Sequence, residues 1–235
     1  MLLHISDLVK KFDAKEVLNI PQFSVAQGEL VGILGNNGAG KTTLFRLCLD
    51  LLKADTGSIF IENEVVNKTD SWKTFTSAYI DEGFLIDFLT PEEYFYFTGD
   101  LYEIDKMQIN SVLNDFIPFT EDEILNKKKC IEKFSKGNKQ KIGIISAMLT
   151  RPRLLILDEP FNFLDPSSQI MMKQLLLDYN QKYSTTILLS SHNLQHVMDV
   201  CSRVILLESG HIIRDNTSIN DINRNEIKQY FENKA

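Results

Sequence analysis

The sequence predicts an α/β fold with a mostly parallel sheet, and three observations support this class. The chain has 235 residues, of which 43% are hydrophobic, so it can bury a sizeable core. Short apolar runs rich in β-forming residues recur along it. Helical patterns separate the later runs, and strands that alternate with helices form mostly parallel sheets. A globular α/β domain is therefore expected.

The expected strands lie in the first and last thirds of the chain. They cover residues 2–9, 29–34, 57–63, 76–80, 153–160, 185–192 and 203–210, with a hairpin return into residues 211–215. Apolar residues at helical spacing predict a helix over residues 40–51, and residues 220–234 read as a polar helix.

Residues 91–150 differ from the rest because helical patterns follow one another there without an obvious strand between them. Pro91 suits the first position of a helix. Further helical patterns cover residues 105–117 and 137–149. This block predicts a helical insertion into the α/β core.

Composition limits the classes of function. A formal net charge of −7 argues against a broad nucleic-acid surface, since phosphate backbones are bound by clustered Lys and Arg. No apolar run approaches the roughly 18 to 20 residues of a membrane span, and the N-terminus does not resemble a signal peptide, so a cytoplasmic protein is expected. Cys48, Cys130 and Cys201 lack CxxC spacing and are expected to be inert thiols.

Residues 35–42, with the sequence GNNGAGKT, match the phosphate-loop pattern G-x-x-x-x-G-K-[ST] completely. The loop lies between a predicted strand and a predicted helix, the context that this pattern requires. Its glycines let backbone N–H groups turn towards phosphate oxygens, Lys41 would reach the β and γ phosphates, and Thr42 would bind Mg²⁺. The expected nucleotide-binding residues are Gly35, Asn36, Asn37, Gly38, Ala39, Gly40, Lys41, Thr42 and Thr43. A glycine-rich turn without a ligand is the alternative.

Two adjacent acids and a histidine follow apolar strands at positions where open α/β sheets bind ligands. Asp158 would hold Mg²⁺ through water, and Glu159 would orient or deprotonate the water that attacks the γ-phosphate. His192 could donate a hydrogen bond to the same phosphate. Taken alone, the acids could be solvated strand-end residues and His192 structural, but the complete phosphate loop favours catalytic roles for the acids.

In this order, the motifs resemble those of the ATP-binding subunit of ABC transporters over nearly the whole chain, from Phe12 to His192. GNNGAGKTT resembles the Walker A motif, LLILDEP the Walker B motif, NFLD at 162–165 the D-loop and SSH at 190–192 the H-loop. FSKGNKQK, at residues 134–141, lies where the family has its LSGGQ signature.

The signature keeps Ser135 and Gly137 but has Lys136 and Asn138 at two positions that differ from the family. In that family the signature of one subunit closes over ATP held by the other, which implies that Ser135 and Gly137 contact nucleotide across a dimer. Without the resemblance, Ser135 would be read as a helix N-cap.

The resemblance also implies roles for two isolated residues. Phe12 lies where the family has an aromatic residue that stacks on adenine, although alone it would be read as a core residue. Glu82 occupies the Q-loop position, where Gln is common, and offers an oxygen to Mg²⁺ or its water.

An aromatic segment follows the Q-loop position and has two interpretations. It lies where the family's helical subdomain meets a membrane partner, but packing inside the helical insertion would require similar residues. Its members are Phe84, Phe88, Tyr94, Phe95, Tyr96 and Phe97.

The resemblance implies a P-loop NTPase fold of ABC type over residues 1–235. A RecA-like core would cover about residues 1–82 and 151–235, with an antiparallel β portion beside the mostly parallel sheet. A helical subdomain would cover about residues 83–150.

The implied function is that of an ATPase subunit with ATP and Mg²⁺ as cofactors. It would dimerise head to tail with a second ATP-binding subunit, as a homodimer, and drive an integral membrane permease from the inner face of the membrane. No nucleic acid is expected. A soluble ABC-type ATPase in translation, DNA maintenance or iron-sulfur assembly is the alternative, which the single cassette and the lack of a coiled-coil insertion disfavour. A regulatory module without turnover is disfavoured by the presence of Glu159 and His192.

Overall fold

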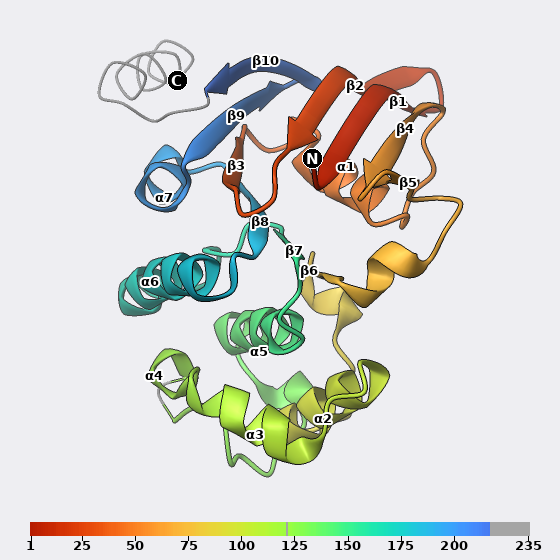
Figure 1. Cartoon of the computed structure of the whole chain (residues 1–235). Helices are drawn as coiled ribbons and strands as arrows, with labels where there is room; N and C mark the ends of the chain where they lie inside the picture. Colours follow the sequence, from red (N-terminus) through yellow and green to blue (C-terminus); the bar gives the residue numbers. More distant parts are fainter. Residues whose placement is uncertain (121, 217–235) are drawn as a thin grey trace.

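The computed structural model describes residues 1–120 and 122–216, and a six-stranded sheet forms its centre (Figure 1). The strand order is β10-β9-β3-β8-β7-β6, and only β10 pairs antiparallel among these described strands. The strands are β3 (Leu30–Leu34), β6 (Thr76–Tyr79), β7 (Leu154–Leu157), β8 (Thr186–Ser191), β9 (Arg203–Glu208) and β10 (His211–Asn216). The mostly parallel α/β core is confirmed.

A second, antiparallel sheet has the strand order β2-β1-β4-β5. Its strands are β1 (Leu3–Phe12), β2 (Lys15–Val25), β4 (Thr56–Ile61) and β5 (Glu64–Val65). The sequence did not predict β2, which contains Pro21, a residue typical of strand edges. In this sheet β2 has a neighbour on one side only, so Pro21 removes no ladder bond on the open side.

The helical block expected between residues 91 and 150 is present, and Figure 1 shows its helices packed together beside the central sheet. Thr90 and Glu93 form a capping box around Pro91, which explains where α2 begins. The α-helices are α1 (Lys41–Cys48), α2 (Pro91–Leu101), α3 (Lys106–Asn114), α4 (Ile117–Thr120), α5 (Lys136–Leu149), α6 (Pro166–Tyr183) and α7 (Leu194–Val200). Short 3₁₀ turns are η1 (Ser71–Thr74), η2 (Glu82–Phe84) and η3 (Ile131–Lys133).

The central sheet is buried on both faces, which accounts for the apolar runs that predicted it. Successive side chains point to opposite faces of a strand. In β7, Leu155 and Leu157 pack into the cluster that includes residues of the helical block, whereas Leu154 and Ile156 pack towards α1 and the antiparallel sheet. All four are fully buried. The sheet is therefore fixed from both sides, and its strand ends are held in place.

Several boundaries differ from the sequence prediction. The helix expected over residues 40–51 ends at Cys48, and the first strand extends to Phe12 rather than residue 9. The helix expected over residues 220–234 lies outside the described residues. Cys48 and Cys201 are buried, and burial raises the pKa of the Cys48 thiol to about 12, as expected of inert thiols.

Gly210, in the turn between β9 and β10, joins both sheets to the phosphate loop. Its N–H donates to the Ala39 carbonyl at 2.9 Å, and its carbonyl accepts from the Asn19 N–H at 2.8 Å. Its φ is 83°, and a Cβ at this position would lie 2.3 Å from the Val17 carbonyl oxygen. Only glycine fits this junction without moving β2.

Replacing Gly210 with Ala should therefore destabilise the fold more than the same change at a glycine with similar φ but open surroundings. Gly28 has a φ of 78°, and a Cβ there would meet only the Ser184 carbonyl at 3.9 Å. We expect Gly28→Ala to lower the free energy of unfolding by about 1 kcal/mol and Gly210→Ala by about 3 kcal/mol. Urea titrations of both variants measure the difference, and equal losses would contradict the close contact.

Candidate nucleotide site

The phosphate loop connects the buried strand β3 to helix α1 and leaves the start of that helix free for a ligand. Gly40, at the N-cap of α1, has a φ of 108° and makes no side-chain capping bond. The first N–H groups of a helix lack internal partners and carry a partial positive charge. This end of α1 therefore has the properties of a phosphate-binding site.

Lys41 is buried within the loop, with 6% of its surface exposed. Its ammonium donates to the Gly35 carbonyl at 2.6 Å and to the Asn36 carbonyl at 3.3 Å. It also lies 3.2 Å from a carboxylate oxygen of Glu159. A buried ammonium is thus held between the loop and the acid that follows β7.

Asp158 is the buried acid at the end of β7, with 7% of its surface exposed. Its Oδ2 accepts a hydrogen bond from the Thr42 hydroxyl at 2.5 Å, and its Oδ1 accepts one from the Ser190 hydroxyl. Burial raises the pKa of Asp158, while hydrogen bonds from Ser190 and Thr42 oppose that increase. The carboxylate therefore lies beside the loop hydroxyl that the phosphate-loop pattern assigns to Mg²⁺.

Glu159 bridges the phosphate loop and the segment after β8. Its Oε2 lies 3.0 Å from Nδ1 of His192, while its other carboxylate oxygen faces Lys41. Its backbone has a φ of 47°, and its N–H donates to the Ser190 hydroxyl at 2.8 Å. The structure thus brings together the predicted loop, Walker B and H-loop residues, which come from three separate segments.

Two further residues position this cluster, and neither was predicted as a site residue. Ser190 is fully buried and binds both Asp158 and the Glu159 backbone. Gln140, on α5, is 3% exposed and donates to the carbonyls of Glu159 and Pro160 at 3.2 and 2.7 Å. The available signal for Gln140 was an amide at the start of a buried helical face, which needs a polar partner.

Ser135 and Gly137 lie apart from this cluster. Ser135 caps α5 by accepting from the Asn138 N–H at 3.2 Å, so the N-cap reading is confirmed. Gly137 packs against the D-loop, since a Cβ there would lie 2.6 Å from the Phe163 carbonyl oxygen. Within residues 1–120 and 122–216, no hydrogen bond or ion pair joins either residue to the phosphate loop.

Phe12 and Glu82 also lie outside the cluster. Phe12 is 46% exposed, so the prediction that Phe12, taken alone, is a core residue is wrong. The Lys10 ammonium lies 5.3 Å from its ring centroid. Glu82 is in η2 and lies 4.0 Å from the Lys136 ammonium. Within residues 1–120 and 122–216, no hydrogen bond or ion pair joins Glu82 to Thr42 or Asp158.

The aromatic segment divides between the two interpretations. Phe95 is fully buried in the core of the helical block, and Tyr94 and Tyr96 pack partly buried against it. Phe84 and Phe88 are exposed at 53% and 75%. Core packing therefore explains the middle of the segment, whereas Phe84 and Phe88 at its start and Phe97 at its end, 44% exposed, present aromatic side chains to solvent.

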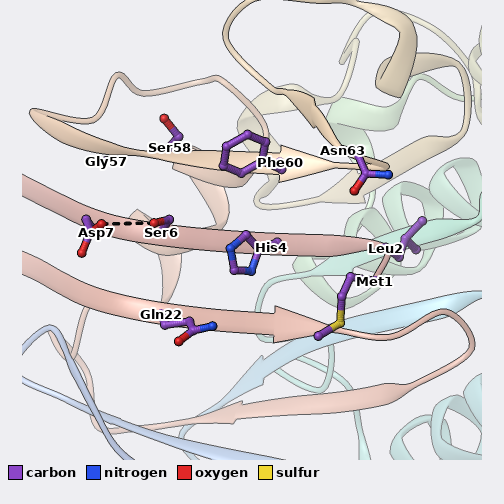
Figure 2. A pocket seen from close by; sticks show the side chains of 10 residues that line it. All are labelled: Met1, Leu2, His4, Ser6, Asp7, Gln22, Gly57, Ser58, Phe60 and Asn63. Atoms are coloured by element: carbon purple, nitrogen blue, oxygen red, sulfur yellow. Dashed lines mark hydrogen bonds between the residues drawn. The ribbon is translucent and has the colours of Figure 1, made fainter.

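A separate hollow of about 700 Å³ lies on the outer face of the antiparallel sheet (Figure 2). Its floor is formed by side chains of adjacent strands, including His4 and Ser6 of β1, Gln22 of β2 and Phe60 of β4. None of the phosphate-loop, Asp158, Glu159 or His192 side chains lines it. The hollow is therefore distinct from the nucleotide site.

A phosphate loop between β3 and α1, a buried aspartate at the end of β7 in the same sheet and a glutamate beside it define a P-loop nucleoside triphosphatase. The sequence pattern of the family described as ABC transporter matches residues 18–162. The chain belongs to this family. It is an ATP-binding and ATP-hydrolysing subunit of the ABC transporter type. In the described part of the chain, no helix has both the length and the apolar character needed to cross a bilayer.

Two relatives of the chain support its membership of this family. The chain is 34% identical to the uncharacterized ABC transporter ATP-binding protein YdbJ of Bacillus subtilis, over 90% of this chain and 68% of the relative. It is 32% identical to the bacitracin transport ATP-binding protein BcrA of Bacillus licheniformis, over 91% of this chain and 69% of the relative.

Solved structures have the same fold. An ATP-binding subunit of an ABC transporter superposes with a TM-score of 0.86 at 28% identity, covering 99% of both chains. The cassette MJ0796, in a dimeric post-hydrolysis state with ADP and Pi, superposes with a TM-score of 0.81 at 20% identity, over 93% of this chain and 100% of that one. The ABC-type fold predicted from the motifs is confirmed.

The burial of Asp158 predicts a stability cost in the nucleotide-free protein. The folded-state pKa is raised above the ordinary value of 3.8, so the stability cost is absent below pH 3.8. The cost grows as the pH rises to the raised pKa, and it is constant above that pKa. Asp158→Asn should remove the cost and raise the free energy of unfolding at pH 7 by about 1 kcal/mol. Urea titrations between pH 4 and pH 8 measure it.

Asp165 provides a control of opposite sign. Hydrogen bonds from Ser167 and Ser168 hold the pKa of Asp165 below its ordinary range. The ionised Asp165 therefore stabilises the fold above its ordinary pKa, and this stabilisation is lost as the pH falls. Asp165→Asn should thus lower the free energy of unfolding at pH 7. A stability loss at pH 7 in both variants would contradict the assigned environment of Asp158.

Proposed function

We propose that this chain works as one of two ATP-binding subunits in a head-to-tail dimer that drives a membrane permease. The single observation that carries the proposal is the position of Glu159, between Lys41 of the phosphate loop and His192. An acid at this position, beside the γ-phosphate end of the loop, is suited to activating water for attack on ATP.

The residues around Asp158 fit a bound Mg²⁺. A hard cation prefers oxygen ligands, and a buried carboxylate beside the Thr42 hydroxyl supplies them. When bound, the ion would neutralise charge on the phosphates. Thr42 would be a direct ligand, Asp158 would act through water, and Ser190 would fix the orientation of the carboxylate.

Lys41 and the loop N–H groups would bind the phosphates, with contacts from Thr43 and the backbone of residues 36–39. ATP would draw the Lys41 ammonium away from Glu159, which leaves that carboxylate free to orient water. His192 is half exposed and holds the other oxygen of Glu159, so it can position the acid and face the γ-phosphate. Each side chain thus has a distinct task.

Half of the site would come from the partner subunit. Ser135 and Gly137 are exposed or half-buried at the start of α5 and make no contact with the chain's own phosphate loop in the described structure. A second copy arranged head to tail would place them over the first copy's ATP. Phe12, which is exposed beside Lys10, is available to stack on adenine.

A permease would dock at the exposed apolar surface formed by Phe84 and Phe88. These residues flank the loop that leads into the helical block, so movement of that block on ATP binding would reach the docked partner. The relative BcrA is described as a bacitracin transport protein, which supports a role in transport but does not define the cargo of this chain.

Replacing Glu159 with Gln should abolish water activation and leave ATP binding intact. We expect the rate of ATP hydrolysis to fall about 100-fold or more, the range for loss of a general base, while ATP affinity changes little. Phosphate release and nucleotide titration measure the two quantities. Glu103→Gln, at an exposed residue of the helical block, is the control and should retain turnover. Normal turnover in Glu159→Gln would refute the role.

The docking surface can be tested with the double substitution of Phe84 and Phe88 to Ala. Because both side chains are exposed, the free energy of unfolding should change by less than about 0.5 kcal/mol. Co-purification of a multi-span membrane protein with the tagged chain should fall about tenfold. Ile170 and Leu177, exposed at 68% and 38% on α6, provide a matched pair whose replacement should have no effect on recovery. Unchanged co-purification of the membrane protein, together with a loss of stability, would contradict the docking role of Phe84 and Phe88.

A further inference from the structure

Two positions at which the chain departs from the family pattern lie beside each other. Glu82 stands where Gln is common, and Lys136 stands in the signature where the family has Gly. The Lys136 ammonium lies 4.0 Å from a carboxylate oxygen of Glu82. It also lies 5.3 Å from the ring centroid of Phe163 in the D-loop. The two departures thus form one charge pair between the Q-loop and the signature.

A second pair joins the same two segments but differs in exposure. Lys139 lies 3.6 Å from Asp87, and only 15% of the Lys139 side chain is exposed. The Lys136 side chain is 66% exposed and that of Glu82 is 45% exposed. Lys139 is therefore packed in place, whereas Lys136 can leave Glu82 at little cost, because exposed ion pairs are weak.

The location of Lys136 favours exchange of Glu82 for another anion. Lys136 is the first residue of α5, whose first turn contains no acidic residue. A cation at the N-terminus of a helix is repelled by the positive end of the helix dipole, so a nearby anion stabilises Lys136 in this position. In the described structure Glu82 is the acid that pairs with Lys136. A more highly charged group, such as a triphosphate, would compete for the same ammonium.

We propose that Lys136 is an additional nucleotide-binding residue, which contacts the phosphates of ATP held by the partner subunit, and that Glu82 is the competing anion that holds Lys136 when no nucleotide is present. This inference rests on the head-to-tail dimer proposed above. Glu82 then acts through Lys136 and raises the ATP concentration at which the dimer closes. The Lys136–Glu82 pair therefore sets the ATP concentration that this chain requires for dimer closure.

The test measures ATP-dependent dimerisation and does not depend on turnover. In the Glu159→Gln protein, light scattering with Mg²⁺ and increasing ATP gives the concentration for half-maximal dimer. Added to this background, Lys136→Gln should raise that concentration about tenfold, and Glu82→Gln should lower it about threefold. Carrying both changes, the protein should behave as Lys136→Gln alone, because Glu82 acts only through Lys136.

Matched controls are Lys139→Gln and Asp87→Asn, which remove the Lys139–Asp87 pair between the same segments. Both should leave the ATP concentration for half-maximal dimer within about twofold of the parent, since Lys139 is held in its pair. Increasing salt should weaken dimerisation of the parent more than that of Lys136→Gln, because one phosphate contact is lost in the variant.

The outcomes separate this inference from the proposed function. If the Glu159→Gln parent forms no dimer with ATP, the head-to-tail proposal fails. If it dimerises but Lys136→Gln has no effect, or the Glu82→Gln effect persists without Lys136, the inference fails and the dimer stands. Equal effects of the Lys136 and Lys139 changes would also overturn it, because general loss of positive charge would then explain both.

Discussion

The hydrogen bonds of the buried Asp158 carboxylate connect the parts of the nucleotide site. One oxygen accepts from Thr42 on α1, and the other accepts from Ser190 at the end of β8. Because a buried carboxylate is costly without partners, both hydroxyls must stay in place. This constraint fixes the phosphate loop, β7 and β8 relative to one another. Glu159, the next residue, receives its position from the same arrangement through the Ser190 hydroxyl.

Gln140 extends this arrangement into the helical block. It is on α5, five positions after Ser135, and it binds the carbonyls of Glu159 and Pro160. The helix that carries the signature is thus tied at its buried face to the backbone of Glu159, the acid proposed to activate water. Movement of α5 on dimer closure would act on Glu159 through these bonds. Charge pairs near the start of the same helix, at Lys136 and Lys139, link it to the Q-loop segment.

Much of the fold followed from local signals. The apolar strands of the central sheet, the start of α2 at Pro91 and the hairpin at Gly210 were predictable because each depends on neighbouring residues. The β2 strand was missed because Pro21 and its exposed polar residues obscure the pattern, and only pairing with β1 makes it a strand. Phe12 on its own reads as a core residue because hydrophobicity does not reveal which face of a strand end is covered.

The sequence by itself determined the phosphate loop, the acids after β7 and the order of motifs, since these depend on residue types at fixed spacing. The tertiary structure alone decided that Ser190 and Gln140 position the acids, and that Glu82 lies beside Lys136 rather than beside Asp158. It also separated the buried Phe95 from the exposed Phe84 and Phe88. The physical reason is that burial and hydrogen-bond partners arise from segments far apart in the chain, so no local pattern contains them.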